Sequence, residues 1–529
     1  MSKYILIALF FICNSQALSA QKNKTYNLVT DFGAKPDNKT DNYSAFVKAA
    51  ASLSNSSGRV LVIPKGNYYI AAYKILDGNK KNSITDIVFK NCRNLTVEGN
   101  NSMIRMNGNF SRNRDYQIQG LPYNYAYNNT VCPFKLVSCK TVTIKNLLLY
   151  GEVDKMKKQE GVVEGENYGV NIADDEPGDT SSNIVLQNIT AHHFAADGFI
   201  IKSNGENIVI NKCRSYNNAR QGLSIVKGSN IKCLFSFFDS TGKTGAYGWH
   251  APGAGIDVEN EFGWGKLNNV LIQNCTMRGN TGFQIVTTLP SEKVVIDSCF
   301  IADETTGYSD GLNGVGMYSL NSTLSNSILF ATIQVDLADQ IYKGEVVQQF
   351  SKNLIYSGHR GITSASFSRP AVITGNIFIM LPQPQTDTYF PYIQNGSCRF
   401  NDNIIVVHAD RIKKEPNQVT ALVQGVIEAN NDFWLMNGYD IPKDKQRKNY
   451  FYMALNGTRS LKNHFTPENE KMDALFFPQR KKLTDLQVDK ILNTPLFAAY
   501  KQKVYSKFFL DQANAVRKYA ASIVAAVKE

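Results

Sequence analysis

A short motif that returns along this 529-residue chain constrains its fold more than any other feature. Each copy alternates apolar and polar residues and is flanked by Asn or another polar residue. Copies begin at Asn94, Thr141, Asn183, Asn207, Asn230, Asn269 and Lys293, and the closest ones lie 24, 23 and 24 residues apart. The alternation predicts short strands, and no helical pattern separates them. We therefore expect an all-β chain that forms a right-handed parallel β-helix, with successive coils about 4.8 Å apart.

Both ends of such a solenoid expose core and unpaired backbone, so each end needs a cover. The segment from Asp41 predicts an N-terminal capping helix, and its apolar face consists of Ala45, Phe46, Ala49, Ala50 and Leu53. After about residue 440 the residue composition becomes typical of helices. We expect three parts: a signal peptide over 1–20, a parallel β-helix domain over 21–440 and a C-terminal helical appendage over 441–529.

The first 20 residues have the pattern of an export signal. Lys3 supplies a positive charge, Ile5 to Cys13 form an apolar run, and Ala17 to Ala20 form a small-residue cleavage site. The apolar run is too short to span a bilayer. The sequence therefore predicts a secreted or periplasmic protein without membrane insertion.

The cysteines favour buried thiols over a metal site. Eight remain after processing, and no two of them form a CxxC pair. Cys213, Cys275 and Cys299 follow similar strand segments, which predicts an inward stack of small thiols, with disulfides left open as the alternative.

The charge balance points to an anionic partner. The chain has 57 Lys and Arg residues against 45 Asp and Glu residues, which gives a formal net charge of +12. For an exported protein, we expect the partner to be an acidic polysaccharide or oligosaccharide and not a nucleic acid. Nothing in the pattern requires a second subunit, and we expect a monomer.

A recurrent glycine aligns five coils and predicts which side chains face outward together. The glycines are Gly169, Gly198, Gly222, Gly255 and Gly282. One outward row then contains Asn171, Ile200, Ser224, Asp257 and Gln284, and its neighbour contains Ala173, Lys202, Val226, Glu259 and Val286. Residues just before the glycines include Tyr168, Asp197 and Gln221, with Arg220 one position earlier. We expect these polar side chains to form a substrate groove.

Two carboxyl residues in this groove lie two positions apart on one strand. The Cα atoms of Asp257 and Glu259 should be about 6.5 to 7 Å apart. Close carboxyl groups separate each other's pKa values, so one of them can hold a proton. The spacing also falls in the range of inverting glycosidases. With Asp197 or the acidic segment ADDEPGD, these carboxylates would also suit Ca²⁺, which is left open as a cofactor.

A loop between Asp239 and Gly253 supplies further candidates. Tyr247 and Trp249 are suited to stacking on a sugar ring, and His250 to proton transfer. The predicted catalytic residues are Lys202, Arg220, His250, Asp257 and Glu259. The predicted substrate-binding residues are Tyr168, Asn171, Asp197, Gln221, Tyr247, Trp249 and Gln284.

The segment DFGAKPDNKTDNYSAFVKAAASLSNSSGRVLVIPKGNYYI, from Asp31 to Ile70, resembles the N-terminal segment of the pectate-lyase-like β-helix superfamily. That superfamily includes polysaccharide lyases, polygalacturonase-type glycoside hydrolases and phage tailspike depolymerases. The resemblance implies the same fold to about residue 430 and leaves hydrolysis, elimination and epimerisation open as reactions.

The polygalacturonase-type pattern is met in part. AADG at Ala195 to Gly198 stands where those hydrolases have Asn-Thr-Asp-Gly. One coil later, Arg220-Gln221 replaces an expected Asp-Asp pair, and Gly253-Ala254-Gly255 replaces Gly-His-Gly. These departures argue against polygalacturonase activity.

Of the reactions that the resemblance leaves open, we favour β-elimination on an acidic, uronate-containing polysaccharide. A lyase needs a cation for the uronate carboxylate, a base and an acid, and the groove offers Arg220, Lys202, His250 and the two carboxyl groups. The alternatives are an inverting glycoside hydrolase, an epimerase and a non-catalytic carbohydrate-binding solenoid.

Overall fold

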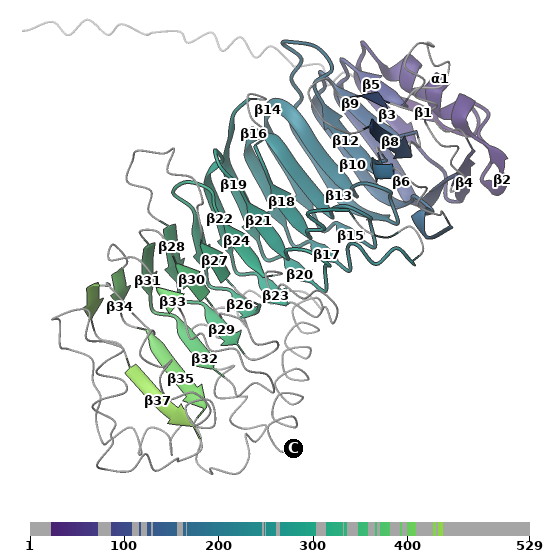
Figure 1. Cartoon of the computed structure of the whole chain (residues 1–529). Coiled ribbons are helices and arrows are strands. Elements are labelled where there is room, and N and C mark those ends of the chain that lie inside the picture. The colour runs from purple at the N-terminus through teal and green to yellow at the C-terminus, as the bar shows by residue number, and fades with distance from the viewer. Residues whose placement is uncertain are drawn as a thin grey trace, which may run out of the picture.

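A computed structural model gives the fold of most of the chain (Figure 1). It describes residues 23–71, 86–107, 116–117, 124–128, 131–155, 162–165, 167–245, 248, 250–260, 265–302, 314–331, 333–335, 348–357, 365–367, 371–380, 392–393, 399–401, 403–408, 427–429 and 432–436. Nearly all strands in these ranges join one continuous 34-stranded sheet of parallel pairings, because long strands bend from one face of the solenoid to the next. The fold is a right-handed parallel β-helix, as the repeats predicted.

Three stacks of strands form the faces of the solenoid. The first sheet contains β5 (Val88–Lys90), β9 (Phe134–Val137), β12 (Val170–Ala173), the start of β14 (Phe199–Asn211) and of β16 (Leu223–Leu234), β18 (Ile256–Val258), β21 (Ile285–Thr287), β24 (Val315–Met317), β27 (Ile333–Val335), β30 (Ala365–Phe367) and β33 (Tyr392–Ile393).

The second sheet contains β1 (Lys24–Asn27), β3 (Ser57–Val62), the first halves of β6 (Arg93–Met106), β10 (Lys140–Tyr150) and β13 (Ser182–His192), the ends of β14 and β16, β19 (Leu267–Gln273), β22 (Glu292–Asp297), β25 (Thr323–Ser325), β28 (Gln348–Ser351), β31 (Ala371–Thr374), β34 (Arg399–Asn401) and β36 (Ile427–Ala429).

The third sheet contains β2 (Asp37–Asp41), β4 (Asn67–Ile70), the second halves of β6, β10 and β13, β15 (Arg214–Tyr216), β17 (Phe237–Asp239), β20 (Thr276–Arg278), β23 (Phe300–Ala302), β26 (Ile328–Phe330), β29 (Leu354–Ser357), β32 (Ile377–Met380), β35 (Ile404–His408) and β37 (Asp432–Met436). A small separate sheet contains β7 (Tyr116–Gln117), β8 (Asn124–Asn128) and β11 (Val162–Gly165), and a short 3-10 helix, η1, spans Val153–Lys155.

Helix α1 (Tyr43–Leu53) covers the N-terminal end of the solenoid, as predicted (Figure 1). Its buried residues are Ala45, Phe46, Ala49, Ala50 and Leu53. The ring of Phe46 meets that of Tyr68 edge to face, with centroids 6.2 Å apart. The helix therefore closes the first coils with the apolar face that the sequence pattern gives it.

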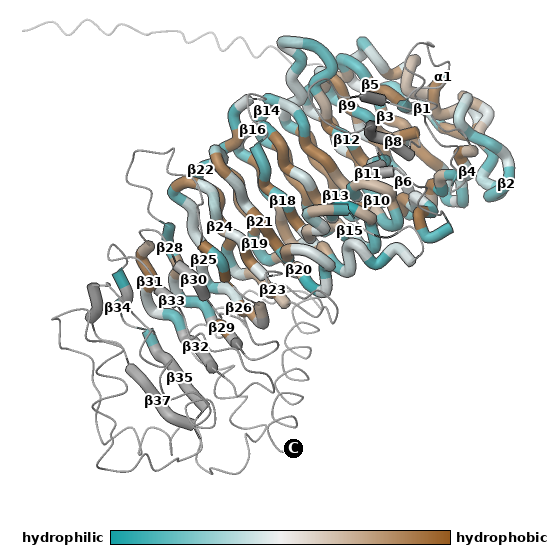
Figure 2. The backbone as a smooth tube through the Cα atoms, in the orientation of Figure 1, coloured by the Kyte–Doolittle hydropathy of each residue, from teal (hydrophilic) through white to brown (hydrophobic). Residues whose placement is uncertain are grey.

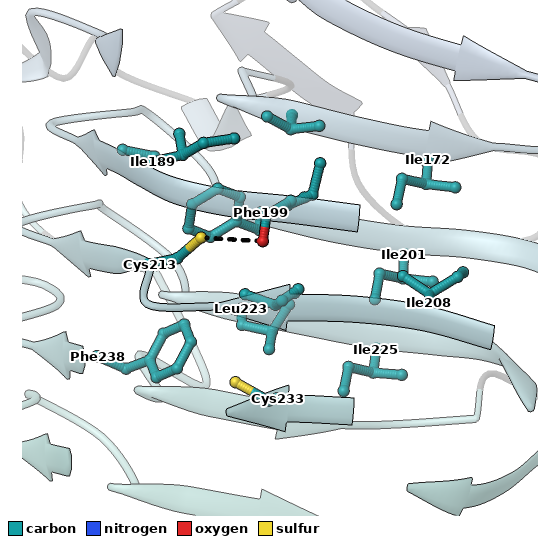
Figure 3. Close-up of a cluster of buried hydrophobic side chains, with 14 of the residues drawn as sticks. Ile172, Ile189, Phe199, Ile201, Ile208, Cys213, Leu223, Ile225, Cys233 and Phe238 are labelled. Atoms are coloured by element: carbon teal, nitrogen blue, oxygen red, sulfur yellow. Dashed lines mark hydrogen bonds between the residues drawn. The ribbon is translucent and has the colours of Figure 1, made fainter. Parts of the chain in front are cut away.

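Aliphatic side chains stack from coil to coil inside the solenoid. Ile172 pairs with Ile201, and Ile201 with Ile225, so identical residues lie directly above one another (Figure 3). The strands alternate inward apolar and outward polar residues, which appears as alternating colour along the tube in Figure 2. The described cysteines are buried free thiols, as predicted in preference to disulfides: Cys92, Cys132, Cys139, Cys213, Cys233, Cys275 and Cys299. Cys398 lies outside the described residues.

Buried corners are closed by a ladder of asparagine side chains. The Oδ1 atom of Asn376 accepts the backbone N–H of Asn353 at 2.9 Å, and Asn403 does the same for Asn376. The Nδ2 atom of Asn376 donates to the carbonyl of Phe350 at 3.0 Å. Side chains thus satisfy backbone groups that a turn between sheets would leave buried without partners.

The predicted signal peptide and the predicted C-terminal appendage lie outside the described residues. Among the residues that are described, no helix has the length and apolar character needed to cross a membrane.

Candidate active site

The outer face of the first sheet brings the predicted polar residues together. In the register of this sheet, Asn171 lies opposite Ile200, Ile200 opposite Ser224, and Ser224 opposite Asp257. The same row continues toward the N-terminus with Lys135, opposite Asn171. The glycines before these strands also stack from coil to coil. The backbone N–H groups of Gly169, Gly198 and Gly222 each donate to a carbonyl of the next coil. The glycine alignment therefore predicted this row correctly for the four coils from Gly169 to Gly255.

Asp197 and Arg220 form a bidentate ion pair in the turns that lead into this sheet. Nε of Arg220 donates to Oδ1 of Asp197 at 2.8 Å, and a terminal guanidinium nitrogen donates to Oδ2 at 2.6 Å. The side chain of Asp197 is 0% exposed and that of Arg220 is 16% exposed. The hydroxyl of Ser224 adds a third bond to Asp197, at 2.9 Å. The positive charge of Arg220 is therefore largely balanced by the buried carboxylate of Asp197.

Gln221 links this ion pair to Asp257. Its Oε1 lies beside the Ser224 hydroxyl, whose one hydrogen is shared between Gln221 and Asp197, and its Nε2 donates to Oδ2 of Asp257. Asp257 is buried, whereas Glu259 on the same strand edge is exposed. Burial, and next the neighbouring Glu259 carboxylate, raise the pKa of Asp257 well above its usual range, although Arg220 acts in the opposite direction. The raised pKa favours the protonated form of Asp257, because burial and a nearby negative charge both oppose its ionisation.

Lys202 occupies the neighbouring outward row, opposite Ala173. Its Nζ lies 3.4 Å from the hydroxyl of Tyr168 and 5.2 Å from the centroid of the Tyr168 ring. Beneath this contact, Cys132, Tyr168, Ala196, Ile200 and Val226 form a small apolar cluster on the outside of the sheet. Lys202 is thus half-buried over an apolar floor, with a phenol beside its amine.

Two further lysines in the groove were missed by the glycine alignment. Lys135 pairs with Asp175 at 2.8 Å, and Lys227 pairs with Asp174 at 3.5 Å. The strand of Lys135 has no glycine before it, so the alignment passed over it. A register shift in β14 and β16 places Lys227, and not Val226, opposite Lys202. The segment FKLV and the lysine after Val226 were visible signals, but a bulge cannot be located from the repeat.

The acidic segment after β12 is occupied by these lysines and by local hydrogen bonds. Oδ2 of Asp174 accepts the backbone N–H of Asn204 at 2.7 Å, and Asp179 accepts the hydroxyl of Ser138. Within the described ranges, no group of three or more His, Cys, Asp or Glu side chains is arranged to hold a metal ion. The acidic side chains of this segment are therefore engaged in salt bridges and hydrogen bonds with neighbouring residues. A role for Ca²⁺ stays a prediction.

The predicted position of Gln284 was wrong. Asp257 lies opposite Val286, two residues further along than the glycine alignment had it. Gln284 is 0% exposed and accepts the side-chain amide of Asn280 at 2.9 Å. The reason lies at Gly282, where a Cβ atom would come within 1.6 Å of the Pro252 carbonyl. That glycine is needed for a close contact between loops and does not mark the start of a strand.

The loop after Asp239 contributes a buried histidine. His250 is 5% exposed, and its backbone N–H donates to the carbonyl of Ala219 at 2.8 Å, next to Arg220. The loop thus covers the turn that carries Arg220, and the role of His250 in catalysis stays a prediction. Tyr247 and Trp249 lie outside the described residues.

No family model matches the chain. A polygalacturonase of Malus domestica is 32% identical over 152 residues, which are 25% of this chain and 32% of that protein. The chain therefore spans about a third of the length of the curated relative that it matches.

Several solved structures are similar to the chain at low identity. They are PfbA, a surface adhesin of Streptococcus pneumoniae (TM-score 0.48, 12% identity, 79% of this chain and 93% of that chain), the A-module of the mannuronan C-5 epimerase AlgE6 of Azotobacter vinelandii (0.34, 16%, 78% and 93%) and the pectate lyase Pel9A (0.35, 13%, 78% and 78%). The strand register itself establishes that the chain has the right-handed parallel β-helix fold that its N-terminal segment predicted.

Proposed function

We propose that this protein is an exported enzyme that cleaves an acidic, uronate-containing polysaccharide by β-elimination. The fold, the basic net charge of +12 and the partial match to a polygalacturonase support an acidic glycan as substrate. The polar face of the first sheet supports a reaction there, because it gathers a lysine–tyrosine pair and a buried carboxyl group with a raised pKa, Asp257, within a few coils.

The arrangement of the carboxyl groups favours elimination over hydrolysis. Inverting hydrolysis needs an acid and a separate carboxylate base, about 6.5 to 9.5 Å apart, with water between them. Here the neighbouring Glu259 carboxylate helps to raise the pKa of Asp257, and Asp197 is held by Arg220. Asp257 is thus the candidate for the acid, and the Lys202–Tyr168 pair and His250 are the candidates for the base. The observation that carries the proposal is the contact between Lys202 and Tyr168 on the same sheet face as the buried Asp257.

The reaction follows from these positions. A base at the Lys202–Tyr168 pair removes the C5 proton of a uronate. The C5–H electron pair forms the C4–C5 double bond, the bond from C4 to the glycosidic oxygen breaks, and the Asp257–Glu259 pair returns a proton to that oxygen. The cations on this face of the sheet, Arg220, Lys135 and Lys227, stabilise the negative charge of the substrate carboxylate.

A panel of pectate, alginate, chondroitin, hyaluronan and neutral glucans tests this function. We expect ultraviolet absorbance of an unsaturated uronate to grow with at least one acidic glycan. Lys202→Ala should lower turnover by at least about 10². Reducing ends without that absorbance would reject elimination, and binding without any product would make the protein a carbohydrate-binding solenoid.

Inverting hydrolysis is the second candidate, because the raised pKa of Asp257 favours its acid form beside the exposed carboxylate of Glu259. It predicts the reverse pattern of variants. Asp257→Asn and Glu259→Gln would each abolish release of reducing ends, and Lys202→Ala would mainly raise KM.

A further inference from the structure

Tyr168 lies two residues before β12, with its hydroxyl 3.4 Å from the amine of Lys202. Resting on the proposed elimination, we propose that the Tyr168 hydroxyl is the base that takes the C5 proton, and that Lys202 is the cation that stabilises the Tyr168 phenolate. The opposite assignment would make the lysine itself the base. The contacts of both residues favour tyrosine as the base and lysine as the cation.

The position of Tyr168 is well defined. Gly169, next to it, lies so close to the neighbouring coil that a Cβ atom there would be 2.5 Å from the Gly198 carbonyl. The ring packs among Cys132, Ala196, Ile200 and Val226, and 6% of the residue is exposed. A phenol held in this way presents its hydroxyl in one direction, toward Lys202, which a flexible lysine would not do for its own amine.

The contacts of Lys202 suit a fixed cation. An ammonium beside a phenol favours the ionised phenolate, whereas a lysine acts as a base after it has lost its charge. The other groove cations described are paired with carboxylates: Arg220 with Asp197, Lys135 with Asp175 and Lys227 with Asp174. The polar contact of Lys202 in the structure is with the Tyr168 hydroxyl, at 3.4 Å.

The proton balance closes with these groups. The phenolate of Tyr168 takes the C5 proton, and the released electron pair forms the C4–C5 double bond as the C4–O bond breaks. The Asp257–Glu259 pair gives a proton to the leaving oxygen. Solvent then removes the proton from Tyr168 and restores the one lost by the carboxyl pair.

Three variants separate the two assignments on a glycan that the wild-type protein eliminates. We expect Tyr168→Phe to lower kcat by at least about 10² at similar KM, and Lys202→Arg to keep activity within about 10-fold, because Arg supplies charge and cannot act as a base. Tyr216→Phe, on the third sheet, serves as the matched control with unchanged activity. Full activity in Tyr168→Phe would overturn the inference.

Lys202→Ala provides a second measurement that does not depend on how well Arg fits. Its activity should be restored by added methylammonium and equally by low concentrations of guanidinium, since both are cations. Restoration by amines alone, rising with the fraction of free amine as pH increases, would make Lys202 the base and reject the inference. A wild-type protein that forms no unsaturated product from any glycan would instead reject the proposed function. Circular dichroism confirms that each variant is folded.

Discussion

Asp197 and Arg220 show how burial changes the consequence of one substitution. An exposed ion pair contributes little to stability, and the sequence pattern treats Arg220 as such a surface cation. In the structure its partner carboxylate is fully buried and receives two guanidinium bonds. Removing Arg220 would leave a buried charge without compensation. We therefore expect Arg220→Ala to lower the free energy of unfolding by about 3 to 5 kcal/mol.

Urea unfolding at neutral pH measures this effect. The double variant Asp197→Asn with Arg220→Met is the matched control, because it removes both charges together. It should recover most of the stability that Arg220→Ala loses. Equal stability of Arg220→Ala and the wild-type protein would mean that Asp197 does not need its partner, and would leave Arg220 with only its predicted role toward the substrate.

At the scale of an element, the outer face of the third sheet carries an aromatic stack. The rings of Tyr150, His192 and Tyr216 lie on successive coils, with centroids 4.8 and 4.7 Å apart. Nδ1 of His192 lies 2.6 Å from Nδ1 of His193. Burial first, and next the charge of His193, lower the pKa of His192 to about 4, with Arg214 adding to the shift and Asp154 opposing it.

This shift predicts an acid-sensitive sheet. Between pH 6.5 and about 4, the unfolded chain binds a proton at His192 that the folded protein excludes. Stability is therefore full above pH 6.5 and falls as pH decreases through this window, by at most about 1.4 kcal/mol per pH unit. His192→Phe keeps the stack and removes the proton, so its free energy of unfolding should fall less between pH 6.5 and 4.5. Parallel pH dependences of the two proteins in urea unfolding would contradict the role of His192.

For the whole molecule, the excess of positive charge is the relevant quantity. The chain carries a formal net charge of +12, while most of the described groove cations are already paired with carboxylates. Long-range attraction should therefore contribute more to glycan capture than many direct ion pairs. We expect the affinity for an acidic glycan to fall about 10-fold between low and high salt, because salt screens exposed charges.

Isothermal titration with an oligouronate at several salt concentrations measures this dependence. Lys202→Ala, which prevents turnover under the proposed mechanism, allows binding to be followed without cleavage. A neutral oligosaccharide of equal length is the control, and its weak binding should not change with salt. An acidic glycan that binds equally at low and high salt would show that net charge does not guide capture.

The repeat pattern predicted much of the architecture because it records local constraints. The alternation of residues such as Val185 and Leu186 determines which side faces the core, and the Asn at each corner satisfies a turn. The same reasoning predicted the buried face of α1, including Phe46 and Leu53. From Gly169 to Gly255, where each glycine directly precedes a strand of the first sheet, it also predicted which side chains share the first outward row.

Sequence by itself therefore determined the β-helix, its helical cap and the sheet face that gathers Tyr168, Lys202 and Asp257. Tertiary structure decided which of those groups are engaged with one another: Arg220 with Asp197, Gln221 with Asp257, and Lys202 with Tyr168. It also moved Gln284 out of the groove, since a glycine needed for a loop contact resembles one that begins a strand. The physical reason is that strand alternation depends on neighbours in the chain, whereas burial, charge pairing and register after a loop depend on neighbours in space. Gln221 and Asp257, for example, are hydrogen-bonded although 36 residues separate them in the sequence.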